Sequence, residues 1–255
     1  MLLAVDIGNT NIKIGLFESD KLVHSFKMST DIKRTADEHK SVLKQLLQDS
    51  KIDFLKIDGI IVSSVIPQLD YSFDRMLYNL FNIKPMIVGV GIKTGLCIKY
   101  EFPRELGSDR IITSVAALKK YGAPFVLVDY GTATTYNVVN AKEEFLGGAI
   151  TLGIRSTVDA LSAVASKLPQ VEISSPQKAI AQSTAKAIQS GVVYGAVGQT
   201  MYIVDKIKKE LKDSSVKVIA TGGLSYLVAE QEHIFDYVDK ELSLIGLNVI
   251  YNLNK

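Results

Sequence analysis

Two short segments carry the residue types that bind phosphate groups. Each follows an aliphatic run and places an aspartate two residues before a glycine, as Asp6-Ile7-Gly8-Asn9-Thr10-Asn11-Ile12-Lys13 and as Asp129-Tyr130-Gly131-Thr132-Ala133-Thr134-Thr135. Glycine lets the backbone approach a ligand closely, and the N–H groups and side chains after it can donate to phosphate oxygens. Asp6 could hold Mg²⁺, which prefers oxygen ligands from few carboxylates and from phosphate, and Lys13 could neutralise phosphate charge. One such segment is more often a polar turn than a site, but two of them favour nucleotide chemistry.

The two segments belong to a longer internal repeat. Val5, Asp6 and Gly8 match residues 128, 129 and 131 at an offset of 123 (129 − 6), which is close to half of the 255 residues. Each half opens with a strand, an Asp-x-Gly turn, a second strand, a polar turn and a third strand. Chance similarity is the alternative, but the shared order of several elements favours duplication.

Alternating helices and strands are predicted for the rest of each half. Helical spacing of apolar residues predicts helices over residues 35–48, 71–81, 109–121, 157–168, 177–189, 192–211 and 242–253, and aliphatic runs predict strands over residues 59–65, 86–88 and 216–220. This alternation is typical of α/β architecture. We predict two domains, residues 1–118 and 119–255, joined at a packed hinge that Gly122 and Pro124 mark.

Composition and charge exclude several classes of protein. With 47% hydrophobic and 22% charged residues, the chain is typical of a globular protein and not of a disordered or collagen-like one. A net charge of +2 argues against a generic nucleic-acid binder. No apolar run is long enough to cross a membrane, and the start MLLAVDIG lacks the basic region of a secretory signal. We therefore expect a cytoplasmic protein with neither a nucleic-acid nor a membrane partner.

The cysteine and the histidines indicate no metal site and no nucleophile. Cys97 is the single cysteine, so no intramolecular disulfide can form, and its apolar neighbours predict a buried small side chain. His24, His39 and His233 are scattered, and we expect them to face solvent or to cap helices. The charged run over residues 206–212 is expected to be a solvated helix face.

Five segments together resemble the motifs of type III pantothenate kinases. The first runs from Asp6 to Lys13, and the others, in the family's order, are Tyr100-Glu101-Phe102-Pro103-Arg104-Glu105-Leu106-Gly107-Ser108-Asp109-Arg110, Val128 to Thr135, Gly147-Gly148-Ala149-Ile150 with Gly153, and Thr221-Gly222-Gly223. The resemblance implies an α/β fold of duplicated ribonuclease-H-like (actin-like ATPase) domains, with a mixed central sheet flanked by helices in each. It also implies that ATP phosphorylates the primary hydroxyl of pantothenate, the first step toward coenzyme A.

The resemblance further assigns roles to individual residues. Asp109 would be the general base that accepts the hydroxyl proton, while Asp6 would hold Mg²⁺ and Asp129 a monovalent cation, K⁺ or NH₄⁺. The residues implied in nucleotide and phosphate binding are Asp6, Gly8, Asn9, Thr10, Asn11, Ile12, Lys13, Gly131, Thr132, Thr134, Gly222 and Gly223. Those implied in substrate binding are Tyr100, Gly107, Ser108, Asp109, Arg110 and Thr184, the last contributed by the partner subunit of a homodimer.

Judged from the residues alone, three of these positions have ordinary structural explanations. Asp109 would be a helix N-cap, Arg110 would form an ion pair, and Thr184 would be a hydroxyl on a helix surface. An aspartate at a helix start can be both cap and base, because the N-terminal dipole favours its ionised form.

Two positions depart from the family's pattern. Asn137 stands where the family more often has Asp, and Leu152 stands where it usually has Pro. We expect the first to alter a turn or an ion contact and the second to loosen a turn near the dimer interface. Two other functions stay open: another small-molecule kinase of the same superfamily, and a regulatory relative that acts as a transcriptional accessory factor.

Overall fold

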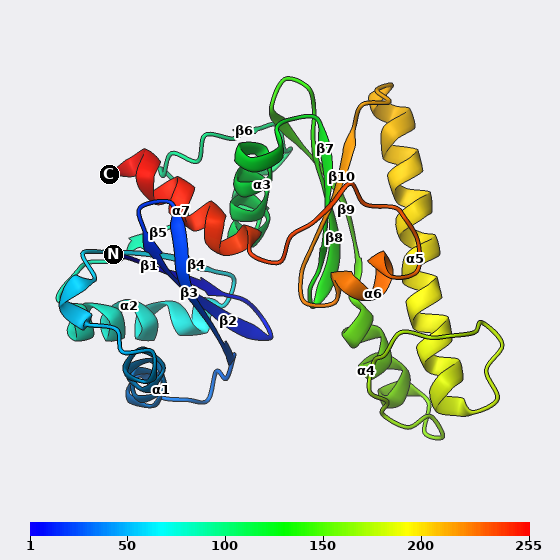
Figure 1. The fold of residues 1–255 in the computed structure, drawn as a ribbon, viewed down its shortest axis with the longest axis horizontal. Coiled ribbons are helices and arrows are strands. Elements are labelled where there is room, and N and C mark those ends of the chain that lie inside the picture. The colour runs from blue at the N-terminus through cyan, green and yellow to red at the C-terminus, as the bar shows by residue number, and fades with distance from the viewer. The chain divides into compact units, whose positions relative to one another are not determined.

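The computed structural model describes all 255 residues, and the chain forms two compact units (Figure 1). The first unit contains Met1–Leu96, Phe102–Lys119 and Leu242–Lys255, and the second contains Cys97–Glu101 and Lys120–Glu241. The last helix of the chain therefore packs with the first unit, whereas the second predicted domain runs on to residue 255.

A five-stranded mixed sheet forms the centre of the first unit. Its strand order is β3-β2-β1-β4-β5, with β1 at Leu2–Ile7, β2 at Asn11–Glu18, β3 at Lys21–Ser29, β4 at Gly59–Ser64 and β5 at Met86–Ile87. The strands β1, β2 and β3 form an antiparallel meander, and β4 returns parallel to β1. A parallel return needs a long crossover connection, which here contains helix α1 at Ala36–Asp49.

The two faces of this sheet are covered by different helices. Leu3, Val5 and Ile7 of β1 share a hydrophobic core with residues of α1 and of α2, which spans Pro67–Phe81. Because side chains alternate along a strand, Ala4 and Asp6 point to the opposite face. That face carries the last helix, α7 at Leu242–Asn254, which packs against α3 at Ser108–Tyr121 (Figure 1).

The second unit repeats the strand arrangement of the first. Its sheet has the order β11-β10-β7-β8-β9-β6, where β6 is Cys97–Ile98, β7 Phe125–Tyr130, β8 Ala133–Val139, β9 Glu144–Leu152, β10 Lys217–Thr221 and β11 Tyr237–Val238. Here β7, β8 and β9 form the antiparallel meander and β10 runs parallel to β7. The start of β7 lies 123 residues after the start of β1 (125 − 2), which is the offset found in the sequence.

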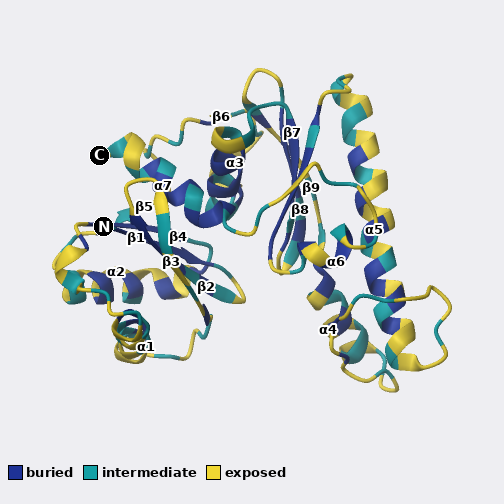
Figure 2. Cartoon of the chain, viewed as in Figure 1, coloured by how far each residue is buried: buried dark blue, intermediate teal, exposed yellow.

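Three helices bury one face of the second sheet. They are α4 at Ile154–Val164, α5 at Thr184–Leu211 and α6 at Ser225–Ala229, and their apolar residues share a core with Val126, Val128 and Tyr130 of β7. The hydroxyl of Thr200 on α5 hydrogen-bonds to both Tyr130 (2.7 Å) and Tyr136 (3.0 Å) in this core. Figure 2 shows the central strands β1 and β7 buried along their lengths. The predicted α/β fold of two like sheets flanked by helices is confirmed.

The prediction of three helices after residue 157 was wrong in part. Residues 177–183 form no helix, and a single helix, α5, runs from Thr184 through the expected break near residue 190. Ser183 starts it by accepting a hydrogen bond from the N–H of Lys186, and the buried Val192 and Val193 hold the middle of the helix against the core. Packing of this apolar stripe outweighs the local preference of Gly191 for a turn.

Two smaller predictions were also wrong. Cys97 is exposed, because β6 is a two-residue strand at the edge of its sheet. His39 is buried, because it lies one and two turns before Leu43 and Leu47 on the face of α1 that meets α2. His24 and His233 are exposed as predicted, and so are most residues of the charged run over 206–212. None of the helices combines the length and the apolar character that crossing a bilayer requires.

Candidate functional site

The centre of the first unit's site is a row of three polar residues across the sheet. Asp6 on β1 lies opposite Lys13 on β2 and opposite Ser63 on β4. Residues in register point to the same face of a sheet, so the three side chains gather on the side that carries α7. Ser243, in the first turn of α7, hydrogen-bonds to the Asp6 carboxylate and accepts a hydrogen bond from Lys13 Nζ at 3.3 Å.

The Asp6 carboxylate is buried, with a relative exposure of 8%. Burial raises the pKa of Asp6, and the charge of Lys13 together with a hydrogen bond from Ser243 opposes that rise. The nearby charge of Asp109 raises the pKa further, which places the predicted general base close to the predicted Mg²⁺ residue in the same unit. The fold thus brings together Asp6, Lys13 and Asp109, which lie far apart in the sequence.

The turn from β1 to β2 is held from behind by the end of β3. The Gly8 N–H donates to the Asn11 carbonyl at 3.1 Å, and a Cβ at Gly8 would lie 3.1 Å from the same oxygen. Thr30 donates through its hydroxyl to the Gly8 carbonyl (2.6 Å) and through its N–H to the Thr10 carbonyl (3.0 Å). These bonds engage carbonyl groups of the turn, which leaves a rigid frame for the exposed residues Asn9 and Thr10.

The start of α3 carries the predicted substrate residues. The helix begins at Ser108, so Asp109 lies in its first turn and is not the N-cap that the residues alone suggested. The Ser108 hydroxyl accepts a hydrogen bond from Ser63 (2.9 Å) and donates to the Ser64 carbonyl (3.0 Å), which ties α3 to β4. A Cβ at Gly107 would collide with Asp109 Oδ1, so glycine leaves room for this orientation of the carboxylate.

Asp109 and Arg110 differ in their exposure. Asp109 is half-buried, and its Oδ1 accepts a hydrogen bond from the Arg110 N–H at 2.8 Å. Arg110 is 7% exposed, which is unusual for an arginine.

The second unit gathers Asp129, Gly131 and Gly222 at the ends of β7 and β10. The Gly131 N–H donates to the Ala133 carbonyl at 3.1 Å, as the Gly8 N–H does to Asn11 in the first unit. Gly222 has φ +93°, and a Cβ there would lie 2.6 Å from both Asp129 Oδ1 and the Tyr130 carbonyl oxygen. Thr221 lies beside Asp129 in the parallel pairing, where the first unit has Ser63 beside Asp6.

The residues around this turn support it. Gly153 packs against the carbonyls of Gly131 and Thr132, and the Ser156 hydroxyl donates to the Thr132 carbonyl at 2.7 Å. Thr132 and Gly223 are exposed, while Thr134 is buried. Asn137 is buried within β8, and its amide donates to Thr135 Oγ1 at 3.1 Å, so it lies in the strand and not in the turn.

Tyr100 meets the glycine-rich segment of β9. A Cβ at Gly147 would lie 3.1 Å from Tyr100 Cε2, and Gly147 has φ +109°. A Cβ at Gly148 would collide with the carbonyl of Tyr136 on the neighbouring strand. These glycines therefore allow an aromatic ring and a strand to approach β9 closely.

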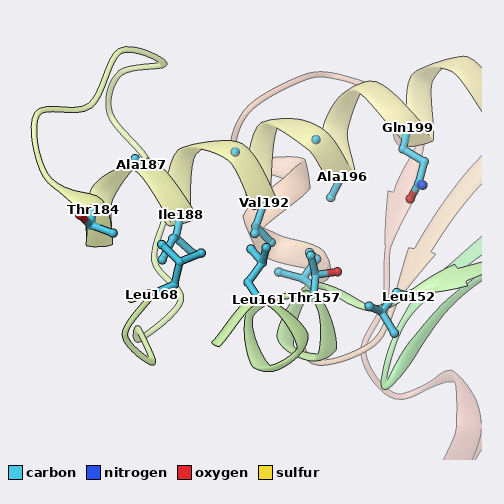
Figure 3. A pocket seen from close by; sticks show the side chains of 13 residues that line it. Leu152, Thr157, Leu161, Leu168, Thr184, Ala187, Ile188, Val192, Ala196 and Gln199 are labelled. Carbon is cyan, nitrogen blue, oxygen red and sulfur yellow. The ribbon is translucent and has the colours of Figure 1, made fainter. Parts of the chain in front are cut away.

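Thr184 lies elsewhere in the second unit, in an apolar groove between α4 and α5 (Figure 3). The groove has a volume of about 600 Å³. Leu161 and Thr157 of α4 face Val192 of α5, and Leu152 lies toward the end of the groove where Gln199 is found (Figure 3). Thr184 and Leu152 lie toward opposite ends of the groove (Figure 3), and Leu152 adjoins Gly153, which packs against the turn at Gly131.

Sequence reasoning missed three hydroxyl residues of the first unit: Thr30, Ser63 and Ser243. Thr30 directly follows β3 and hydrogen-bonds to the turn between β1 and β2, while Ser63 lies near the end of β4, which pairs with β1. The pairing of these strands brings both residues to the site. Ser243 comes from a helix more than 200 residues away, and no local motif marks it.

The residues fit a magnesium ion that is held mostly by phosphate. No group of three or more His, Cys, Asp or Glu side chains gathers in a metal-binding arrangement. Asp6 offers one carboxylate that the Ser243 hydroxyl holds in place, and Mg²⁺ commonly takes one or two carboxylates together with substrate phosphates and water.

Comparison with known proteins gives consistent results. The family model described as type III pantothenate kinase matches residues 2–206. A curated type III pantothenate kinase from Bacillus cytotoxicus is 47% identical over 212 residues, covering 83% of this chain and 81% of the relative.

Solved structures show the same fold at low identity. A protein described as a Baf family transcriptional activator from Campylobacter jejuni has a TM-score of 0.57 at 24% identity, covering 98% of this chain and 97% of that one. An inorganic polyphosphate/ATP-glucomannokinase from Arthrobacter sp. strain KM has a TM-score of 0.53 at 13% identity, covering 100% and 99%. These likenesses show that the fold is shared over nearly the whole length of this chain.

Proposed function

The chain belongs to the type III pantothenate kinase family, and from that premise we propose how its residues carry out the reaction. The enzyme phosphorylates pantothenate in the biosynthesis of coenzyme A, with ATP as the phosphoryl donor. The observation that carries our assignment is the meeting of Asp6, Lys13 and Asp109 on one side of the first sheet.

Asp109 is the general base in this proposal. An alcohol is a weak nucleophile until its proton has an acceptor, and the half-buried carboxylate at the start of α3 can accept it. Gly107 and Ser108 fix the helix start, and the guanidinium of Arg110 binds the carboxylate or the amide oxygens of pantothenate. Tyr100 contributes a further contact to the substrate.

The two Asp-x-Gly turns bind the nucleotide. In the first unit, the N–H groups and side chains over residues 8–12 and the ammonium of Lys13 bind phosphate oxygens, and Asp6 holds Mg²⁺, which supplies charge neutralisation on the phosphates. In the second unit, Gly131, Thr132, Thr134, Gly222 and Gly223 bind the nucleotide. Catalysis then rests on positioning and on charge stabilisation, and no phosphorylated enzyme intermediate is needed.

Asp129 holds a monovalent cation, K⁺ or NH₄⁺, in this proposal. Its carboxylate lies where Gly222 leaves room beside Oδ1, and the neighbouring carbonyl of Tyr130 is an oxygen of the type that such cations accept as a ligand. The departure at Asn137 lies within β8, where its amide donates to Thr135, the residue that pairs with Asp129, so it adjoins the proposed cation site.

The enzyme acts as a homodimer in the cytoplasm, and the groove between α4 and α5 is the contact surface. Thr184 lines this groove together with exposed apolar residues such as Leu152. A second copy of the chain bound at this groove would cover its apolar surface. Thr184 of one protomer would then reach the pantothenate site of the other protomer. Leu152, which replaces the usual proline, adds an apolar side chain to this surface.

The test is a purified-enzyme assay of the Asp109→Asn variant with pantothenate, ATP and Mg²⁺. We expect kcat to fall about 10²- to 10⁴-fold, since the amide cannot accept the proton, while the variant stays folded. Asp70→Asn is the matched control, because Asp70 also lies in the first turn of a helix in the same unit, and its turnover should not change. Near-normal turnover of Asp109→Asn would refute the base assignment.

The same assay addresses substrate and cation. Wild-type enzyme should phosphorylate pantothenate faster with K⁺ or NH₄⁺ than with Na⁺ alone. Turnover of hexoses without turnover of pantothenate would instead favour a sugar kinase, and equal rates with all cations would remove the cation role of Asp129.

A further inference from the structure

Helix α7 packs on the first sheet at positions where glycine leaves room for its side chains. Gly15 on β2 lies opposite Ala4 on β1, and a Cβ at Gly15 would come 3.0 Å from Leu244 Cδ1. A Cβ at Gly59 on β4 would collide with the Tyr251 hydroxyl near the other end of the helix. These contacts fix the height and direction of α7 over the sheet.

The first turn of α7 is consequently held above the row of Asp6 and Lys13. Leu242 and Leu244 are almost fully buried on either side of Ser243, which is itself 3% exposed. The Ser243 side chain therefore has a fixed position, and it is buried against Asp6 and Lys13.

The Ser243 hydroxyl connects these two charged residues. It accepts from Lys13 Nζ at 3.3 Å and hydrogen-bonds to the Asp6 carboxylate, and a hydroxyl can do both because it has one donor and two acceptor positions. Lys13 and Asp6 are cross-strand neighbours of opposite charge, yet the ion pairs of this chain do not include them. A buried ion pair between them would engage the ammonium and the carboxylate with each other.

We propose that Ser243 is a positioning residue of the phosphate site, whose hydroxyl holds Lys13 and Asp6 apart so that both remain available to the nucleotide. The inference rests on the proposed phosphate-binding role of these two residues. Ser243 acts through them and does not itself touch the reacting atoms. Without the hydroxyl, the Lys13 ammonium is free to bond directly to the Asp6 carboxylate, and this bond must be broken before phosphate binds.

The test compares Ser243→Ala with Ser243→Thr and with a matched control. Ser114→Ala is the control, because Ser114 is a fully buried serine on a helix of the same unit whose hydroxyl has no hydrogen-bond partner. For Ser243→Ala we expect the KM for ATP to rise about tenfold or more, since hydrogen bonds to charged groups are the strong ones. The KM for pantothenate should change less than about twofold, and Ser243→Thr, which keeps the hydroxyl, should recover most of the ATP affinity.

A binding measurement makes the test independent of the reaction. Calorimetric titration of each variant with MgADP, without pantothenate, should show the same tenfold loss for Ser243→Ala and none for Ser114→Ala. This measurement tests the role of Ser243 even if the enzyme phosphorylates an alcohol other than pantothenate. The proposal for Ser243 and the proposal for the substrate can therefore fail separately. Unchanged MgADP affinity in a folded Ser243→Ala variant overturns the inference. So does an equal loss in Ser243→Ala and Ser243→Thr, which would indicate packing and not the hydroxyl.

Discussion

Replacing Gly246 by alanine should displace α7 and destabilise the first unit. Gly246 faces α3, and a Cβ there would collide with the carbonyl of Ile112. The backbone of Gly246 is helical and accepts alanine, so the whole unfavourable effect comes from the collision. A backbone carbonyl within a helix cannot rotate away as a flexible side chain can, and the two helices must therefore separate.

The magnitude is the difference of two opposing effects. Alanine in place of glycine inside a helix gains roughly 1 kcal/mol of stability. Inserting a methyl group into a well-packed contact costs roughly 1–3 kcal/mol, and an immovable partner puts this site at the upper end. We therefore expect the free energy of unfolding to fall by about 2 kcal/mol.

Urea denaturation of Gly246→Ala and of Gly198→Ala provides the assay. Gly198 lies on the exposed side of α5, where an added Cβ would have no atom within 4 Å, so that substitution should raise stability by roughly 0.5–1 kcal/mol. The two variants make the same chemical change in a helix and should shift the unfolding midpoint in opposite directions. A higher midpoint for Gly246→Ala would refute the reasoning. Because Ser243 lies one turn before Gly246, the displaced helix should also weaken MgADP binding.

Two further predictions concern acid stability and assembly. His39 is buried against Phe73, and burial lowers the pKa of His39 below its usual 6.5. The nearby charge of Arg34 lowers this pKa further, while a backbone hydrogen bond with Asp31 and the charges of Asp31 and Glu38 oppose part of the effect. Below pH 6.5 the unfolded chain takes up a proton that the folded state resists, so the free energy of unfolding should fall with pH, by at most about 1.4 kcal/mol per pH unit from this group. His39→Leu should lose less stability than wild type between pH 7.5 and pH 5.5 in urea denaturation, and equal losses would contradict this. Sedimentation equilibrium of the wild-type protein should give twice the mass of one chain. Leu152→Glu places a charge in the α4–α5 groove and should lower the measured mass toward that of the monomer. A monomeric wild-type protein would contradict the proposed dimer.

Local patterns were sufficient for the turns and for the doubled fold. The Asp-x-Gly segments predicted both tight turns, because glycine allows a tight turn directly after a buried strand, and the offset of 123 residues predicted that both halves open with the same three strands. The spacing of His39, Leu43 and Leu47 was also present in the sequence, so the burial of His39 could have been predicted from periodicity.

Other features depend on contacts between distant segments. The continuity of α5 is decided by the core it packs against and not by Ser190 and Gly191, and the exposure of Cys97 follows from its place on an edge strand. Neither the continuity of α5 nor the exposure of Cys97 follows from the type of the local residues, so the local sequence could not predict these two features.

The sequence by itself predicted which residues bind phosphate and, through the family resemblance, which carboxylate acts as a base. Only the tertiary structure decided that Ser63 lies beside Asp6 and that Ser243 lies between Asp6 and Lys13. The physical reason is that residue type sets what a side chain can do, whereas strand register and the return of a helix from the chain's end set what it meets. Hydrogen bonds act over about 3 Å, and only the folded chain brings such distant residues within that range.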